Sequence, residues 1–126
     1  MQHPEEIIGV GPDLLSAFQQ VINQIVGNRE GAGETVQVQA TSKDAEGLLR
    51  NLINQIADTA ESFERQPASV ALDGLRAIEG GLRVWGVMAF AAGGDQVRLP
   101  MVGGVAVQAG EGGFRISLTV GINSEV

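Results

Sequence analysis

The sequence lacks most of the side chains on which small proteins rely for chemistry. Its 126 residues include no cysteine and no tyrosine, and its single histidine, His3, lies close to the N-terminus. Without cysteine there are no disulfides and no thiolate metal ligands. One terminal histidine does not supply a convincing base for a serine or threonine nucleophile. We therefore expect a binding or accessory protein rather than a stand-alone enzyme. An enzyme built on Glu5, Glu6 and the arginines would lack a base–nucleophile pair.

Long apolar runs and positive charge are also scarce. No apolar stretch approaches the ~18 to 20 residues of a membrane helix, and no basic segment followed by an apolar one resembles a secretory signal. The formal net charge of −7 opposes binding to nucleic acid through released counterions. With 44% hydrophobic residues, the chain can form one packed domain, residues 1–126. We expect it to be cytoplasmic and to bind neither a membrane nor nucleic acid directly.

The first half of the sequence alternates between strand and helix periodicity. Two short strands are predicted, and each is followed by a helix whose apolar positions form one stripe. The strands are residues 6–10 and 35–40, and the apolar stripes of the two helices run over residues 14–26 and 48–63. Pro12 and Asp13 suit the first turn of the first helix, and Thr41 or Ser42 is expected to cap the second.

The second half has the pattern of antiparallel strands. The predicted strands are residues 69–78, 82–90, 97–108 and 114–122. Glu79-Gly80-Gly81 predicts a hairpin between the first two, and Gly103-Gly104 predicts a bulge within the third. The last strand alternates strictly between apolar and polar residues, so one of its faces should be buried. The order β-α-β-α-β-β-β-β predicts an α+β sandwich, with two helices packed on mostly antiparallel sheet.

Two kinds of local repetition call for an explanation. Ile22-Asn23-Gln24-Ile25 recurs as Ile53-Asn54-Gln55-Ile56 at the same phase of each helical stripe. An ancestral duplication or a paired polar contact would explain the repeat, but a pattern shared by two amphipathic helices is the simpler interpretation. The glycine clusters of the second half lack the spacing of a phosphate loop, and no Gly-Lys-Ser/Thr follows them, so we interpret them as turns.

Polar residues of the second half could form an anion site. The candidate set is Arg83, Arg98, Arg115, Ser117 and Thr119. Several guanidinium groups on one sheet face would suit a phosphate or carboxylate. The simpler alternative is a solvated face with cross-strand partners such as Asp73 and Glu79. Trp85, the only tryptophan, is expected to anchor the core or a sheet face.

Four segments together match the pattern of a known family. Gln2-His3-Pro4-Glu5-Glu6-Ile7 is similar to Glu-His-Thr-Ala-Asp-Ile, and Leu14, Ala17 and Phe18 match Leu-x-x-Ala-Phe. The stretch from Asp44 to Leu49 is similar to Asp-Leu-Glu-x-Leu-Leu, and Phe114-Arg115 matches an aromatic–arginine pair. Spread over nearly the whole chain, these segments resemble the archease family, small acidic proteins that support the tRNA-splicing RNA ligase.

The resemblance implies an archease-like sandwich that binds a divalent cation, typically calcium. The metal-binding acids of the family correspond here to Glu6, in the opening motif, and Glu125, near the C-terminal end. The implied partner is an RNA ligase, which the protein would assist during guanylylation of that enzyme. The family's Thr-Tyr-His-Asp stretch corresponds to Met101-Val102-Gly103-Gly104, which has no polar side chain. The alternative is therefore a metal-free protein-interaction or oligomerisation module on the same fold.

Overall fold

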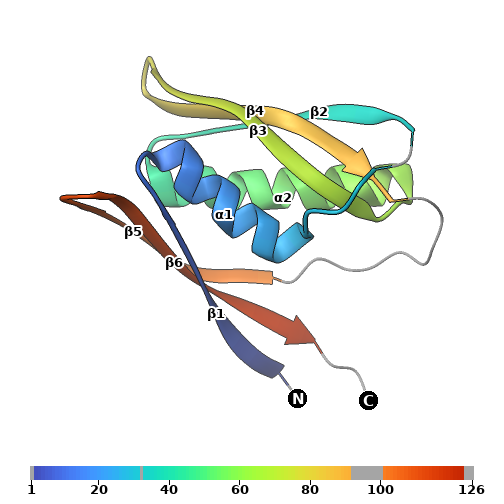
Figure 1. The fold of residues 1–126 in the computed structure, drawn as a ribbon, viewed down its shortest axis with the longest axis horizontal. Helices are drawn as coiled ribbons and strands as arrows, with labels where there is room; N and C mark the ends of the chain where they lie inside the picture. Colours follow the sequence, from blue (N-terminus) through green and yellow to red (C-terminus); the bar gives the residue numbers. More distant parts are fainter. Residues whose placement is uncertain (1, 32, 92–100, 124–126) are drawn as a thin grey trace.

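The computed structural model describes residues 2–31, 33–91 and 101–123, and Figure 1 shows their arrangement. Its elements follow the predicted order. They are β1 (Gln2–Gly11), α1 (Leu14–Val26), β2 (Thr35–Ser42), α2 (Ala45–Phe63), β3 (Pro67–Ile78), β4 (Gly81–Phe90), β5 (Met101–Gly110) and β6 (Gly113–Asn123). The start of the third late strand was predicted at position 97, which lies outside the described residues. No helix in these three ranges is long and apolar enough to span a membrane.

The strands form two three-stranded sheets rather than one. Their orders are β1-β6-β5 and β2-β4-β3, and all four strand pairings are antiparallel. Figure 1 shows both helices lying between the two sheets. A single cluster of buried side chains joins the helices to the inner faces of both sheets. The predicted α+β class with two helices on antiparallel sheet is therefore confirmed.

Helix α1 closes one edge of each sheet through glutamine side chains. The Gln19 amide donates to the Val70 carbonyl at 2.8 Å and accepts from the Leu72 N–H at 2.7 Å, both on β3. On the opposite side of α1, the next glutamine, Gln20, accepts from the N–H of Val10 on β1. Glutamine amides have the donor and the acceptor that an unpaired strand edge requires, so α1 takes the place of a neighbouring strand.

The repeated tetrapeptide belongs to two equivalent β–α units, β1–α1 and β2–α2. Asp13 and Asp44 are the N-caps of the two helices, and 31 residues separate them, as they separate the two copies of the tetrapeptide. Asn51, 31 residues after Gln20, also bonds to the backbone of the preceding strand, although it donates to the Thr41 carbonyl where Gln20 accepts from the Val10 N–H. This equivalence is what a duplication requires, whereas the two tetrapeptides form no paired polar contact with each other.

The first helix has the predicted bounds, whereas the second begins later than its predicted cap. Asp44, not Thr41 or Ser42, caps α2, and its carboxylate accepts from the Gly47 N–H at 2.7 Å. Thr41 and Ser42 continue β2 because their backbone groups still pair with β4. Asp13 caps α1 in the same way, and the Ser16 N–H that it accepts lowers the pKa of the Asp13 carboxyl.

Three register shifts interrupt the strand pairings. In β5 the register shifts between Gly103 and Ala106, where Gly104 adopts a φ of 59°, so the bulge predicted at Gly103-Gly104 is confirmed. Two further shifts lie in β3, between Pro67 and Ser69 and between Leu72 and Gly74, and neither was predicted. The alternation of β6 is confirmed for its described side chains, since Ile116, Leu118 and Val120 are buried. By contrast Phe63, the last residue of the predicted α2 stripe, is 45% exposed.

Candidate functional site

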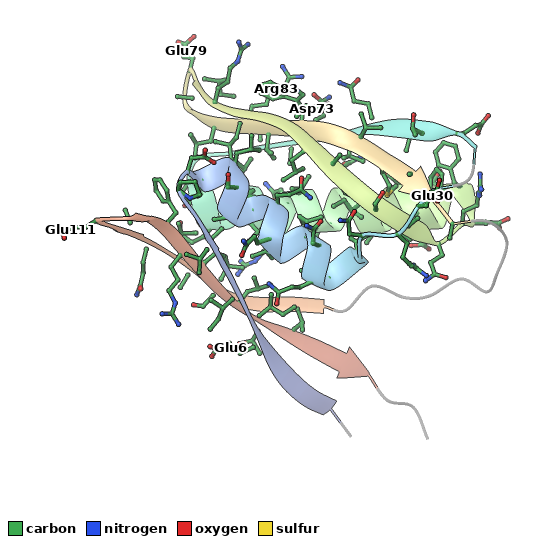
Figure 2. The ribbon with its side chains drawn as sticks, viewed as in Figure 1. Glu6, Glu30, Asp73, Glu79, Arg83 and Glu111 are labelled. Atoms are coloured by element: carbon green, nitrogen blue, oxygen red, sulfur yellow. The ribbon has the colours of Figure 1, made fainter. Side chains whose placement is uncertain are left out.

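Glu6, the first predicted metal ligand, lies on the outer face of the sheet β1-β6-β5. Its side chain is exposed, and Figure 2 shows it apart from the other labelled acidic residues. Because Glu6 pairs with Thr119 and Thr119 pairs with Gly103, these three residues form one row across the three strands. Directly opposite residues of an antiparallel sheet point to the same side, so Thr119 places a hydroxyl next to the Glu6 carboxylate.

The second predicted ligand, Glu125, lies outside the described residues, so the structure does not test the pair. Within the described ranges, no group of three or more histidine, cysteine or acidic side chains could hold a metal ion. The oxygen donors that the sheet register brings together are the carboxylate of Glu6 and the hydroxyl of Thr119. Both are hard ligands of the kind that calcium and magnesium prefer, but such cations require more than two donors.

The row of Glu6 also contains Gly103, which lies across β6 from Glu6. In the predicted resemblance, Gly103 is the third of the four residues that correspond to the polar stretch of the archease family. A Cβ atom added to Gly103 would meet no other atom within 4 Å, whereas Gly104 has a positive φ of 59°. The sheet therefore has room for a side chain at Gly103 that would point to the side of Glu6. Sequence reasoning missed Thr119 as a neighbour of Glu6, because only the register brings them together.

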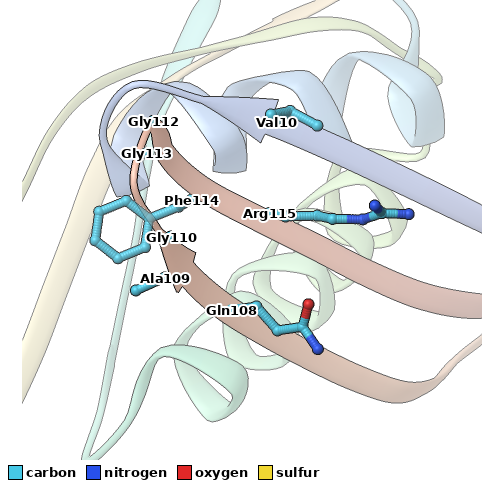
Figure 3. Close-up of a pocket in the computed structure, with 8 residues that line it drawn as sticks. All are labelled: Val10, Gln108, Ala109, Gly110, Gly112, Gly113, Phe114 and Arg115. Atoms are coloured by element: carbon cyan, nitrogen blue, oxygen red, sulfur yellow. The ribbon is translucent and has the colours of Figure 1, made fainter.

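A shallow pocket lies at the other end of the same sheet face. It has a volume of about 360 Å³ and is open to solvent. Figure 3 shows that Val10, Arg115 and Gln108 contribute one side chain each from the three neighbouring strands. Arg115 is exposed and offers a guanidinium group to an anion. Val10 follows Glu6 by four residues along β1, so this pocket is about 13 Å from the Glu6 row.

The five polar residues proposed as one anion site do not share a face. Arg83 is on β4, in the second sheet, while Arg115 is on β6, in the first. Arg98 lies outside the described residues. The guanidinium of Arg83 donates to the Gln39 amide oxygen at 2.6 Å rather than to the predicted carboxylate partners, Asp73 and Glu79.

Trp85 packs on the outer face of the second sheet. Of its two predicted roles, an anchor of the core or of a sheet face, the structure shows the second. Its ring lies against Gly74 of the neighbouring strand, where any larger side chain would collide with it. The guanidinium carbons of Arg83 and Arg76 lie 5.5 Å and 5.8 Å from the ring centroid. These are cation–π distances. The residues of this cluster come from two strands, β3 and β4. The Trp85 ring fits there because Gly74 has no side chain.

Comparisons with known proteins identify a shared fold. No protein-family model matches the chain, and no curated protein matches its sequence. Among solved structures, the chain is similar to the solution structure of Methanobacterium thermoautotrophicum protein 1598, with a TM-score of 0.66 and 17% sequence identity. The alignment covers 96% of this chain and 92% of that chain. At this level of identity the similarity shows that both chains have the same α+β fold.

Proposed function

We propose that this chain is an archease-like accessory protein that binds a divalent cation at Glu6 and assists an RNA ligase. The observation that carries the proposal is the opening motif Gln2–Ile7, which places an acidic residue at the family's metal-binding position and on a solvent-exposed sheet face. The whole-chain similarity to an archaeal protein of the same fold supports it. In this proposal the protein carries out no chemistry of its own.

The residues present suit a hard cation. Glu6 supplies a carboxylate, Thr119 supplies a neutral oxygen from the adjacent strand, and Glu125 is proposed as the second carboxylate. Oxygen-only coordination is what calcium and magnesium prefer. A bound cation would neutralise the phosphates of a nucleotide that approaches the sheet while the ligase performs the transfer. The chain itself would hold the ion and present it on an exposed surface.

Thermal unfolding with and without millimolar calcium, magnesium or manganese tests the cation site. A cation present at 100 times its dissociation constant stabilises the folded state by about 2.7 kcal/mol, which corresponds to a rise of about 10 °C in the midpoint. We expect Glu6→Ala and Glu125→Ala each to abolish this rise. Glu111→Ala is the matched control, because Glu111 is an exposed acid at the β5–β6 turn, away from the Glu6 row. Equal responses of all three variants and the wild type would contradict the site.

The empty position at Gly103 permits a complementary gain-of-function test. Gly103→Asp would add a carboxylate to the Glu6 row without a steric clash. We expect this variant to show a larger cation-dependent rise in midpoint than the wild type. Gly110→Asp, at an equally open glycine near the end of β5, is the control for added negative charge. A larger rise in the Gly110 variant would mean that bulk charge, and not the row, determines cation binding.

The ligase partner is tested separately. Guanylylation of an RNA ligase of the tRNA-splicing type should become faster when this protein is added, and Glu6→Ala should remove the effect. If the wild type binds a cation but leaves guanylylation unchanged, the accessory role is wrong while the cation site stands.

The alternative function is a metal-free interaction or oligomerisation module. It is favoured by Met101-Val102-Gly103-Gly104, where apolar residues and glycine replace the family's polar stretch in and beside the Glu6 row. An unchanged midpoint with every cation would select this alternative over the first.

A further inference from the structure

The outer edge of β2 lacks the closure found at the equivalent edge of β1. In the sheet order β2-β4-β3, β2 pairs with β4 on one side, and no other described strand pairs with its second side. Asn51 donates to the Thr41 carbonyl from beyond that edge. Because backbone groups of a strand alternate in direction, the N–H and C=O groups of residues 35, 37 and 39 point the same way as those of Thr41. They are therefore directed outward, away from β4.

The two equivalent β–α units differ at one glutamine. On β1, Gln20 bonds to Val10 and Gln24 donates to the Ile8 carbonyl at 2.8 Å, so two successive outward positions are satisfied by α1. On β2, Asn51 bonds to Thr41, but the residue equivalent to Gln24 turns away. This residue, Gln55, donates to the Thr59 hydroxyl of its own helix instead.

The result is a polar pocket at the open edge. The pocket has a volume of about 420 Å³ and is lined by Gln39, Ala40, Thr41, Asn51 and Gln55. It occupies the place where a bond from Gln55 to the backbone of Gln39 would repeat the contact of Gln24 with Ile8. Among the described residues, no side chain donates to or accepts from the backbone of residues 35–39.

Strand β2 also lacks the features that normally protect a sheet edge. Its eight residues include no charge and no proline, and its register with β4 runs without a bulge from Thr35 to Ser42. Edge strands of natural proteins usually carry such features because a bare edge pairs with other strands. Although the chain has a net charge of −7, two copies that pair along this uncharged strand would place no like charges opposite each other.

The sequence of β2 is nearly palindromic about Val38. Residues at equal distances from Val38 match in sequence: Gln37 matches Gln39, Val36 matches Ala40, and Thr35 matches Thr41. Two copies paired antiparallel about Val38 would bring these same residues opposite each other. Gln37 would then lie opposite Gln39 of the second copy, and both positions have outward-directed backbone groups. In this pairing the outward backbone groups of the two strands would hydrogen-bond to each other, and similar side chains would lie opposite each other on each sheet face. The two copies would be related by a two-fold axis.

We propose that β2 is a self-association edge, through which two copies of this chain join into one six-stranded sheet of order β3-β4-β2-β2-β4-β3. Asn51 and Gln55 of both copies would flank the joint, because both residues line the pocket at this edge. The Thr41 carbonyl retains a second lone pair beside its bond from Asn51, so that bond does not prevent pairing. The edge lies in the sheet that does not contain Glu6, so dimerisation and cation binding are separate properties.

Charge variants at the two central positions test this proposal. Sedimentation velocity of the wild type across a concentration series should show a monomer–dimer equilibrium, and Gln37→Lys with Gln39→Lys should shift it at least tenfold toward monomer. The Glu double variant, Gln37→Glu with Gln39→Glu, should behave likewise. A mixture of the two should dimerise again, because each lysine would face a glutamate across the joint. Ala71→Lys, on the exposed face of β3, is the control for added charge and should dimerise like the wild type.

Circular dichroism establishes that each variant is folded, and amide hydrogen exchange identifies the joint. The N–H groups of residues 37 and 39 should exchange slowly in concentrated wild type and fast in the lysine double variant. A wild type that remains monomeric at millimolar concentration would overturn the proposal. So would a dimer that the lysine double variant leaves intact, because its joint would lie elsewhere.

Discussion

Truncation of Leu118 is the most direct test of how the two sheets share one core. Leu118 is 1% exposed and lies on β6, the central strand of its sheet, where it pairs with Ile7 of β1. Leu118→Ala removes three carbons, worth about 0.8 kcal/mol each in transfer from water. A remaining cavity of about 50 Å³ would add about 1 kcal/mol. We therefore expect a loss of about 3 kcal/mol in the free energy of unfolding.

Urea unfolding followed by circular dichroism and by fluorescence of Trp85 measures this loss. Circular dichroism averages over all helices and strands, whereas the fluorescence of Trp85 reports locally on β4 in the other sheet. If the core is shared, both transitions should move together, and the thermal midpoint should fall by about 10 to 15 °C. Thr119→Ala, the exposed neighbour on the opposite face, should change stability by less than about 0.5 kcal/mol. A tryptophan transition that stays in place while the other one moves would refute a single cooperative core.

Three further predictions concern local structure. Asp44→Ala should cost about 1 kcal/mol in chemical unfolding, because it removes the α2 N-cap. The lowered pKa of Asp13 means that its charge stabilises the folded state above the ordinary value of 3.8, and that this stabilisation is lost as the pH falls through the lowered pKa. Midpoints of the wild type and Asp13→Asn should therefore differ at pH 7 and converge in acid. Gly113→Ala should destabilise the protein strongly, because its Cβ would collide with the Gly11 carbonyl at a φ of 134°, while Gly112→Ala, with open space, should not.

Periodicity was sufficient to predict the elements and their order. The apolar stripes of both helices and the alternation of β6 depend only on neighbouring residues, so a sequence pattern contains them. The bulge in β3 could not be predicted, because its glycine, Gly74, accommodates the ring of Trp85 from another strand. The hydrogen bonds from α1 to the strand edges could not be predicted either, because Gln19 and its partner Val70 are 51 residues apart in sequence.

The candidate site was only partly accessible to sequence reasoning. Glu6 was found through a motif, but its neighbours Thr119 and Gly103 depend on the register of two strand pairs. Grouping Arg83 with Arg115 was wrong because strands that look alike in sequence separate into two sheets, and no local pattern specifies which sheet a strand joins. The palindrome of β2 was visible in the sequence, but its meaning required knowledge that this strand lies at an edge.

The pairing of the first strand with the last has a consequence for synthesis on the ribosome. Gln2 pairs with Asn123, so β1 has no partner strand until β6 has left the exit tunnel. The sheet β2-β4-β3 and both helices can assemble earlier, because their residues end at Phe90. Until then, Gln20 and Gln24 of α1 would hold the emerging β1 together with the apolar contact of Ile7 with this helix. The glutamines that seal this strand in the mature fold would thus also shield it from other nascent chains during translation.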